Sequence, residues 1–279
     1  MSTEILGFPS DATGESAPSG GAGAPVLVGC SHGTDNVAGQ AAIRAILDDV
    51  RAARPELDVR EAFVDVQQPA VADVVTQAVA PPTAGEGQGG AAVVVPLLLS
   101  AGFHVNVDIT EAVSPAHEGR GPQHGPAVAA GALGPDPRLA QILADRLAQA
   151  GVRPHDAVVL AAAGSSKAAA ARDVEAVAEH LRAHHDGPVT VGFGAMATPS
   201  VRDAVAAARE ALATTTAPRE GSVAPRVVVA AYLLAPGFFH DRLLGTGADV
   251  VTAPLAPDPR LTSIVLDRYA EGVAALALG

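Results

Sequence analysis

The chain has 279 residues, of which 48% are apolar but only 3% aromatic, and its formal net charge is −12. This length suits two ordinary α/β lobes, and the composition predicts cores of Ala, Val, Leu and Ile rather than aromatic rings. The excess of negative charge excludes a general affinity for phosphate backbones or anionic membrane surfaces, so we expect no nucleic acid and no membrane as partners.

Residues 1–24 have neither a cationic start nor a continuous apolar run. We therefore expect a flexible tail there and not a secretion signal. Cys30 is the only cysteine, which rules out an intrachain disulfide and fits a reducing compartment. We expect Cys30 to pack within its strand, and we expect the protein to be cytoplasmic.

From Pro25 onward, short apolar runs alternate with segments of helical period, a pattern that predicts βαβ units and parallel sheets. In the first half we predict strands at 25–31, 58–65, 91–100 and 126–133, and helices at 36–54, 69–80, 106–114 and 137–150. In the second half we predict strands at 156–163, 188–195, 226–234 and 249–255, and helices at 168–184, 199–215, 238–244 and 258–276.

The second half repeats the first. The segment from Leu133 to Leu139 reads Leu-Gly-Pro-Asp-Pro-Arg-Leu, and the segment from Leu255 to Leu261 reads Leu-Ala-Pro-Asp-Pro-Arg-Leu. In both, Asp before Pro is typical of a helix N-cap followed by proline at the first helical position. We predict a tandem duplication with two lobes, at 25–151 and 152–279, each a parallel four-stranded sheet flanked by helices.

Three polar residues of the first half follow predicted strands: His32 after the first, Asp65 at the end of the second and His104 after the third. The carboxyl ends of parallel strands meet at one edge of a sheet, where ligands bind in open α/β folds. Two imidazoles and one carboxylate are suited to Fe, Co, Ni or Zn, and imidazole can also accept protons near neutral pH. We therefore expect a metal-handling site at this edge.

The second half mostly lacks this set. Ala163 stands where His32 stands in the first half, and Ala195 or Met196 stands at the place of Asp65. His240, in Pro-Gly-Phe-Phe-His, is the one residue that echoes His104. We expect the first lobe to carry the chemistry and the second to close the site.

The strand that ends in His-Gly-Thr, the Phe-Val-Asp followed by Val-Gln-Gln-Pro, and the segment Leu-Leu-Leu-Ser-Ala-Gly-Phe-His-Val-Asn-Val-Asp-Ile resemble the sirohydrochlorin chelatases of the class II chelatase group. The resemblance spans roughly residues 25 to 275. It implies that a divalent ion is inserted into a tetrapyrrole between two α/β lobes. It also implies that His32, His104 and Asp65 are the catalytic groups and hold the metal.

The resemblance further implies that the metal is a substrate, Fe²⁺ first, Co²⁺ next and Ni²⁺ after them, with no permanently bound cofactor and with sirohydrochlorin as the partner molecule. The family often has Ser-Arg after His-Gly, whereas Thr34-Asp35 follows here, and its acidic residue is often Glu. For the substrate carboxylates we consider backbone N–H groups near Gly33, Thr34 and Gly102, together with Lys167 on the opposite lobe. Two alternatives stay open: a non-catalytic carrier of metal or tetrapyrrole, and an assembly larger than the expected monomer.

Overall fold

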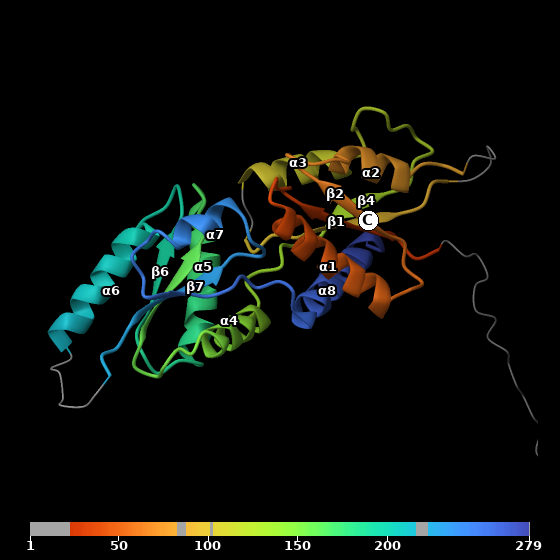
Figure 1. Ribbon diagram of the computed structural model, residues 1–279. Helices are drawn as coiled ribbons and strands as arrows, with labels where there is room; N and C mark the ends of the chain where they lie inside the picture. The colour runs from red at the N-terminus through yellow and green to blue at the C-terminus, as the bar shows by residue number, and fades with distance from the viewer. Residues whose placement is uncertain (1–22, 83–87, 101–102, 216–222, 279) are drawn as a thin grey trace, which may run out of the picture.

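A computed structural model of the chain describes residues 23–82, 88–100, 103–215 and 223–278 (Figure 1). The first half contains β1 (Val26–Ser31), α1 (Val37–Ala53), β2 (Val59–Phe63), α2 (Val71–Ala78), β3 (Ala92–Pro96), α3 (Phe103–Val113), β4 (Ala127–Ala129) and α4 (Pro137–Gln149). The second contains β5 (Ala157–Ala162), α5 (Ala168–Arg182), β6 (Val189–Phe193), α6 (Val201–Thr215), β7 (Val227–Tyr232), α7 (Phe238–Leu243), β8 (Val250–Val251) and α8 (Pro259–Leu276).

The two sheets have the same topology. The strand orders are β2-β1-β3-β4 and β6-β5-β7-β8, and all neighbouring strands are parallel. This confirms the predicted α/β fold of two similar lobes. Within the described residues, no helix combines the length and the hydropathy needed to cross a membrane.

The matching Asp-Pro-Arg segments begin matching helices. Asp136 accepts a hydrogen bond from the Arg138 N–H at 2.9 Å, and Asp258 accepts one from the Arg260 N–H at 3.0 Å. In each case the following proline occupies the start of the helix. The N-caps predicted from the sequence are therefore present in both copies.

The final helix of each half packs on the sheet of the other half. Helix α4 lies against α5 and β7 of the second half, whereas α8 lies against α1, β3 and β4 of the first (Figure 1). One apolar core, which includes Leu143 of α4 and Ile264 of α8, consequently runs through both lobes. The boundary proposed at 151/152 thus divides the sequence repeat, while each packed lobe takes one helix from across it.

The exchange is reciprocal. Arg138 at the start of α4 forms an ion pair of 2.7 Å with Asp267 of α8, and Arg260 at the start of α8 pairs with Asp145 of α4. Asp145 and Asp267 occupy the same position in the repeat. The contact therefore has the form of an isologous interface, in which residue i contacts j and j contacts i, within a single chain.

Gly272 allows α8 to lie close to the first sheet. A Cβ atom at this position would fall 2.3 Å from Cγ1 of Val93 on β3, and Val93 is fully buried. Although Ala favours helix more than Gly does, we expect Gly272→Ala to lower the free energy of unfolding by about 1–3 kcal/mol through overpacking. Urea denaturation followed by circular dichroism measures it. Ala270→Ser, on the exposed face of α8, is the control, and equal midpoints for the two variants would contradict this account.

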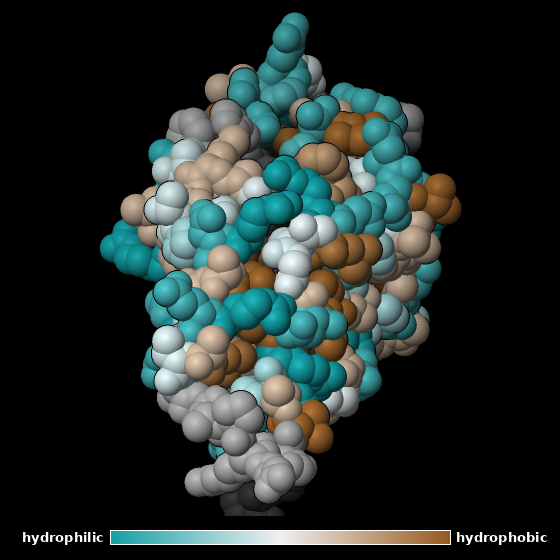
Figure 2. All heavy atoms as spheres, turned by 60° about the vertical axis from the view of Figure 1, so that its left-hand side comes forward, coloured by the Kyte–Doolittle hydropathy of each residue, from teal (hydrophilic) through white to brown (hydrophobic). Residues whose placement is uncertain are grey.

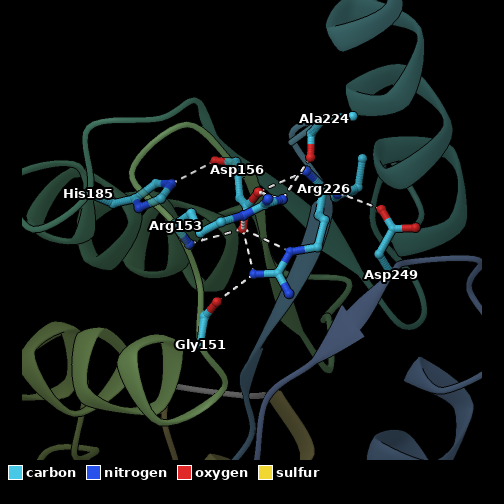
Figure 3. A network of polar contacts seen from close by, with 8 residues as sticks. Gly151, Arg153, Asp156, His185, Ala224, Arg226 and Asp249 are labelled. Atoms are coloured by element: carbon cyan, nitrogen blue, oxygen red, sulfur yellow. Dashed lines mark hydrogen bonds and ion pairs between the residues drawn. The ribbon is translucent and has the colours of Figure 1, made fainter. Parts of the chain in front are cut away.

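At the amino-terminal edge of the second sheet, a buried carboxylate ties two strands together (Figure 3). Asp156, the residue before β5, is 0% exposed and accepts hydrogen bonds from the side chains of Arg153 and Arg226. It also accepts from the backbone N–H groups of both arginines, at 3.0 and 2.8 Å. These bonds hold the pKa of Asp156 far below its usual range despite the opposing effect of burial. The network fixes the starts of β5 and β7.

Candidate metal and ligand site at the strand ends

The loops that follow β1 and β2 lie side by side. His32 comes directly after β1, and its carbonyl accepts a hydrogen bond of 3.0 Å from the backbone N–H of Asp65. The Oε1 atom of Gln67 accepts a second bond, 2.9 Å long, from the backbone N–H of Thr34. Both His32 and Asp65 are exposed. The backbones of these two residues therefore meet at one edge of the sheet, as expected for residues that follow neighbouring parallel strands. Their side chains are accessible to a ligand.

Two unusual backbone positions shape these loops. Gly33 has φ of 92°, and a Cβ there would lie 2.3 Å from the carbonyl oxygen of Asp65, so only glycine fits. Val66 has φ of 57°, which a β-branched residue rarely adopts. Such strain persists where the surroundings impose it and is concentrated at functional sites.

His104 lies in the first turn of α3, because this helix begins at Phe103 and not at the predicted residue 106. The side chain of His104 and the whole of Gly102 lie outside the described part of the structure. Among the side chains that are described, no group of three His, Cys, Asp or Glu residues is placed to hold a metal ion. The joint action of His32, Asp65 and His104 therefore remains a proposal.

The second copy shows what replaces each of these residues. Gly164, with φ of 94°, matches Gly33. A Cβ there would lie 1.9 Å from the carbonyl oxygen of Ala195, just as a Cβ at Gly33 would approach that of Asp65. Ala195 therefore replaces Asp65, and Ala163, the residue before Gly164, replaces His32.

The starts of α3 and α7 match as well, and Phe239 therefore stands at the position of His104. His240 comes one residue later, and its Nε2 lies 3.0 Å from the carbonyl oxygen of Thr252. His240 is thus one residue away from the position that matches His104, and it packs against the end of β8.

Large apolar side chains are exposed around the same strand ends. Val66 is 49% exposed, and Met196, its counterpart in the second copy with φ of 59°, is 77% exposed. Further exposed apolar residues at the starts of α1 and α7 and in α3 are Val37, Phe238, Phe239 and Val107. Exposed apolar groups at matching positions of two lobes favour a ligand with apolar faces.

The lobes touch at this edge. The Cβ position of Gly39 in α1 lies 2.5 Å from the carbonyl oxygen of Pro236, and that of Gly237 lies 3.6 Å from Thr34 Oγ1. On the other side, the buried hydroxyl of Tyr232 donates a 3.0 Å hydrogen bond to the carbonyl of Leu99, in the segment that leads to α3. This role of Tyr232 could not be predicted from the sequence, because its partner lies 133 residues away.

The groups predicted to bind the substrate carboxylates differ in the hydrogen bonds that they already form within the protein. The Thr34 N–H already donates to Gln67, so it is committed within the protein. Lys167 is exposed at the N-cap position of α5, where its backbone N–H donates to Ser165 Oγ. Cys30 is buried in β1, and burial, with a smaller effect of the Asp108 charge, raises its pKa to about 12. As expected, Cys30 packs in its strand as a neutral thiol.

Two parallel sheets of the same topology, with the loops after β1 and β2 hydrogen-bonded to each other, define a two-lobed α/β protein. The CbiX family profile matches residues 26–150 and 157–272, which cover most of both halves. The chain therefore belongs to the CbiX family. A comparison with curated protein sequences found no match.

Solved structures share the fold. SirB from Bacillus subtilis with Fe³⁺ is 21% identical with a TM-score of 0.71, covering 90% of this chain and 96% of that one. The sirohydrochlorin chelatase SirB from Bacillus subtilis subspecies spizizenii in complex with cobalt is 19% identical with a TM-score of 0.67, covering 90% and 95%. CbiX, the terminal enzyme of sirohaem biosynthesis in denitrifying bacteria, is 16% identical with a TM-score of 0.58, covering 88% and 98%. These matches confirm the fold, and the CbiX profile confirms the family resemblance seen in the sequence.

Proposed function

We propose that this protein is a metal chelatase, a lyase that inserts a divalent ion into sirohydrochlorin, with Fe²⁺ favoured for sirohaem and Co²⁺ next for cobalamin biosynthesis. The observation that carries the proposal is the contact between the His32 and Asp65 loops at the edge of the first sheet. Membership of the CbiX family supports it, as do two structural relatives, SirB with Fe³⁺ and SirB in complex with cobalt. We also infer a cytoplasmic monomer with no permanent cofactor.

The chemistry of metallation assigns tasks to these residues. The ion must lose water, two pyrrole protons must leave, and the macrocycle must open to the incoming metal. The exposed imidazole of His32 and carboxylate of Asp65 provide temporary N and O ligands or proton acceptors. His104, carried on the neighbouring helix α3, supplies the third group in this proposal. The apolar residues on the surrounding loops would contact the faces of the macrocycle.

The direct test is to incubate the purified protein with sirohydrochlorin and Fe²⁺, Co²⁺ or Ni²⁺ and to follow the visible spectrum under anaerobic conditions. We expect the protein to accelerate metallation well above the protein-free rate, with many turnovers per molecule. Tight stoichiometric binding without turnover would instead identify a carrier. If neither binding nor acceleration occurs with any of the three ions, the proposed function is wrong.

A further inference from the structure

The second lobe contains a pocket of about 180 Å³ at the carboxyl end of its sheet. It lies between the end of β6, the start of α6 and helix α7. Phe193, Leu233 and Phe239 form apolar walls, and the side chains of Arg202 and Arg242 also line the pocket. A hollow with a mostly apolar lining and a few convergent polar groups is the usual form of a small-ligand site.

Both arginines of this pocket lack an ion-pair partner among the described residues. Within the described residues neither Arg202 nor Arg242 forms an ion pair, although the chain carries 30 acidic residues against 18 basic ones. The one hydrogen bond given for Arg202 runs to the carbonyl of Gly245 at 3.2 Å, and Arg242 stacks over the ring of Phe238 at 5.4 Å. The nearest carboxylate along α6, Asp203, accepts a hydrogen bond from Ser200 and does not line the pocket.

The pocket lies beside the second copy's counterpart of the proposed metal site and shares Phe239 with it. Phe239 replaces His104, so the histidine has given way to an apolar wall. The bridges Phe63–Ala70 and Phe193–Ser200 match, which places Arg202 at the position of Ala72 in the first copy. Arg242 likewise occupies the position of Val107. The second copy has therefore lost the metal-binding groups and carries two cations that the first copy lacks at these positions.

The pocket lies close to the contact between the lobes. Gly237, at the start of α7, faces Thr34 of the first lobe. Arg242 is five residues further on, about 8 Å along a helix that rises about 1.5 Å per residue. In Figure 1, α7 lies at the end of the second sheet that is nearest to α3. Figure 2, which brings the second lobe forward, shows hydrophobic residues interspersed with hydrophilic ones and no continuous apolar face.

We infer that this pocket binds a carboxylate arm of the tetrapyrrole, with Arg202 and Arg242 holding the carboxylate and the apolar walls contacting the methylene groups. The inference rests on the proposed function and accounts for the charge: a substrate rich in carboxylates binds to a protein of net charge −12 through two guanidinium groups that form no ion pair among the described residues. Guanidinium groups bind carboxylates through paired, charge-assisted hydrogen bonds. Anchoring on the second lobe leaves the first free to handle the metal.

The test is to measure the dissociation constant of metal-free sirohydrochlorin by its visible difference spectrum, for the intact protein and for Arg202→Gln, Arg242→Gln and the double variant. We expect each single substitution to raise Kd about 10-fold or more, since a hydrogen bond to a charged group is lost. Arg202→Lys and Arg242→Lys, which keep the charge but lose the paired geometry, should have intermediate values. Raising the salt concentration should weaken binding less in the double variant than in the intact protein.

Arg209→Gln is the matched control, because Arg209 lies on the same helix but pairs with Asp249 and does not line the pocket. Its Kd should equal that of the intact protein. If the intact protein metallates sirohydrochlorin but the Gln variants, folded by circular dichroism, bind it equally well, the pocket inference is overturned and the proposed function stands. If the intact protein neither binds nor metallates sirohydrochlorin, both are overturned.

Discussion

Replacement of His32 by Ala should lower the rate of metal insertion about 100-fold or more while leaving the Kd for sirohydrochlorin nearly unchanged. The imidazole is exposed at the end of β1 and makes none of the hydrogen bonds that hold its loop, which run through the backbone of Asp65 and the side chain of Gln67. Its loss therefore removes a ligand or proton acceptor and leaves the fold intact. A positioned acid–base group contributes typically about 10²–10⁴-fold to a rate.

Asp65→Asn should give a loss of the same kind, because the amide retains the size of the carboxylate but not its charge or its basicity. The measurements are initial rates of metallation at saturating sirohydrochlorin and Kd by spectral titration. His180→Ala is the control, since His180 is exposed in the last turn of α5, in the second lobe and away from the strand ends that carry the proposed site. A His32→Ala variant with normal turnover, or one that fails only because it no longer binds the macrocycle, would contradict the assigned role.

The second large effect is expected on stability. Asp156→Ala should lower the free energy of unfolding by about 3–5 kcal/mol, because it leaves two arginines facing a buried site without their common partner. Arg153 and Arg226 are about one third exposed, with 34% and 30% of their side-chain surface accessible, so water can solvate part of the orphaned charge and the effect should lie toward the lower end of this range. Thermal and urea unfolding followed by circular dichroism give the value.

The stability conferred by Asp156 depends on pH in a defined direction. Its pKa is lower in the folded protein than in the unfolded chain, where an Asp has a pKa of about 3.9. Its contribution is therefore fully present above the unfolded pKa and is lost as the pH falls through the folded pKa. The difference in stability between the intact protein and Asp156→Asn should be constant from pH 7 to about pH 5 and should shrink below about pH 4.

Asp48→Asn is the matched control, because Asp48 also pairs with an arginine, Arg51 at 2.7 Å, but on the surface of α1. Exposed pairs of this kind contribute about 0–1 kcal/mol, so this substitution should cost little. Equal destabilisation by Asp156→Asn and Asp48→Asn would show that burial of the network in Figure 3 does not matter.

The sequence predicted the elements well because apolar period, turn residues and caps are local properties. All eight strands and eight helices expected in the described residues are present, and the repeat of Asp-Pro-Arg located two helix starts to within one residue. The exchange of α4 and α8 was not predicted, because the apolar face of either helix can cover either sheet. The sequence did contain one indication of the exchange, namely that Asp145 and Asp267 occupy the same position in the repeat. These acidic residues recur at one position because each pairs with an arginine of the other copy.

The edge of the first sheet was predicted from topology, since parallel strands end together. The register of the second copy required the structure. From the sequence His240 resembled a counterpart of His104, but the matching starts of α3 and α7 place Phe239 there. Arg202 and Arg242 escaped notice because an exposed arginine is ordinary in sequence. Only the fold shows that the two line one pocket and that neither is paired with an acidic side chain among the described residues.

The exchanged helices have a consequence for how the molecule is made and how it moves. When the ribosome has made the chain up to β8, α8 is still missing. This helix packs on β3 and β4 of the first sheet, so Val93 and Val95 of β3 lack part of their apolar cover until it emerges. The first lobe therefore cannot complete its core until α8 has been made, whereas the second lobe, which uses α4, has all its elements once β8 has emerged. In the finished protein the same arrangement links the lobes at two points, so any opening movement must carry α4 and α8 with it.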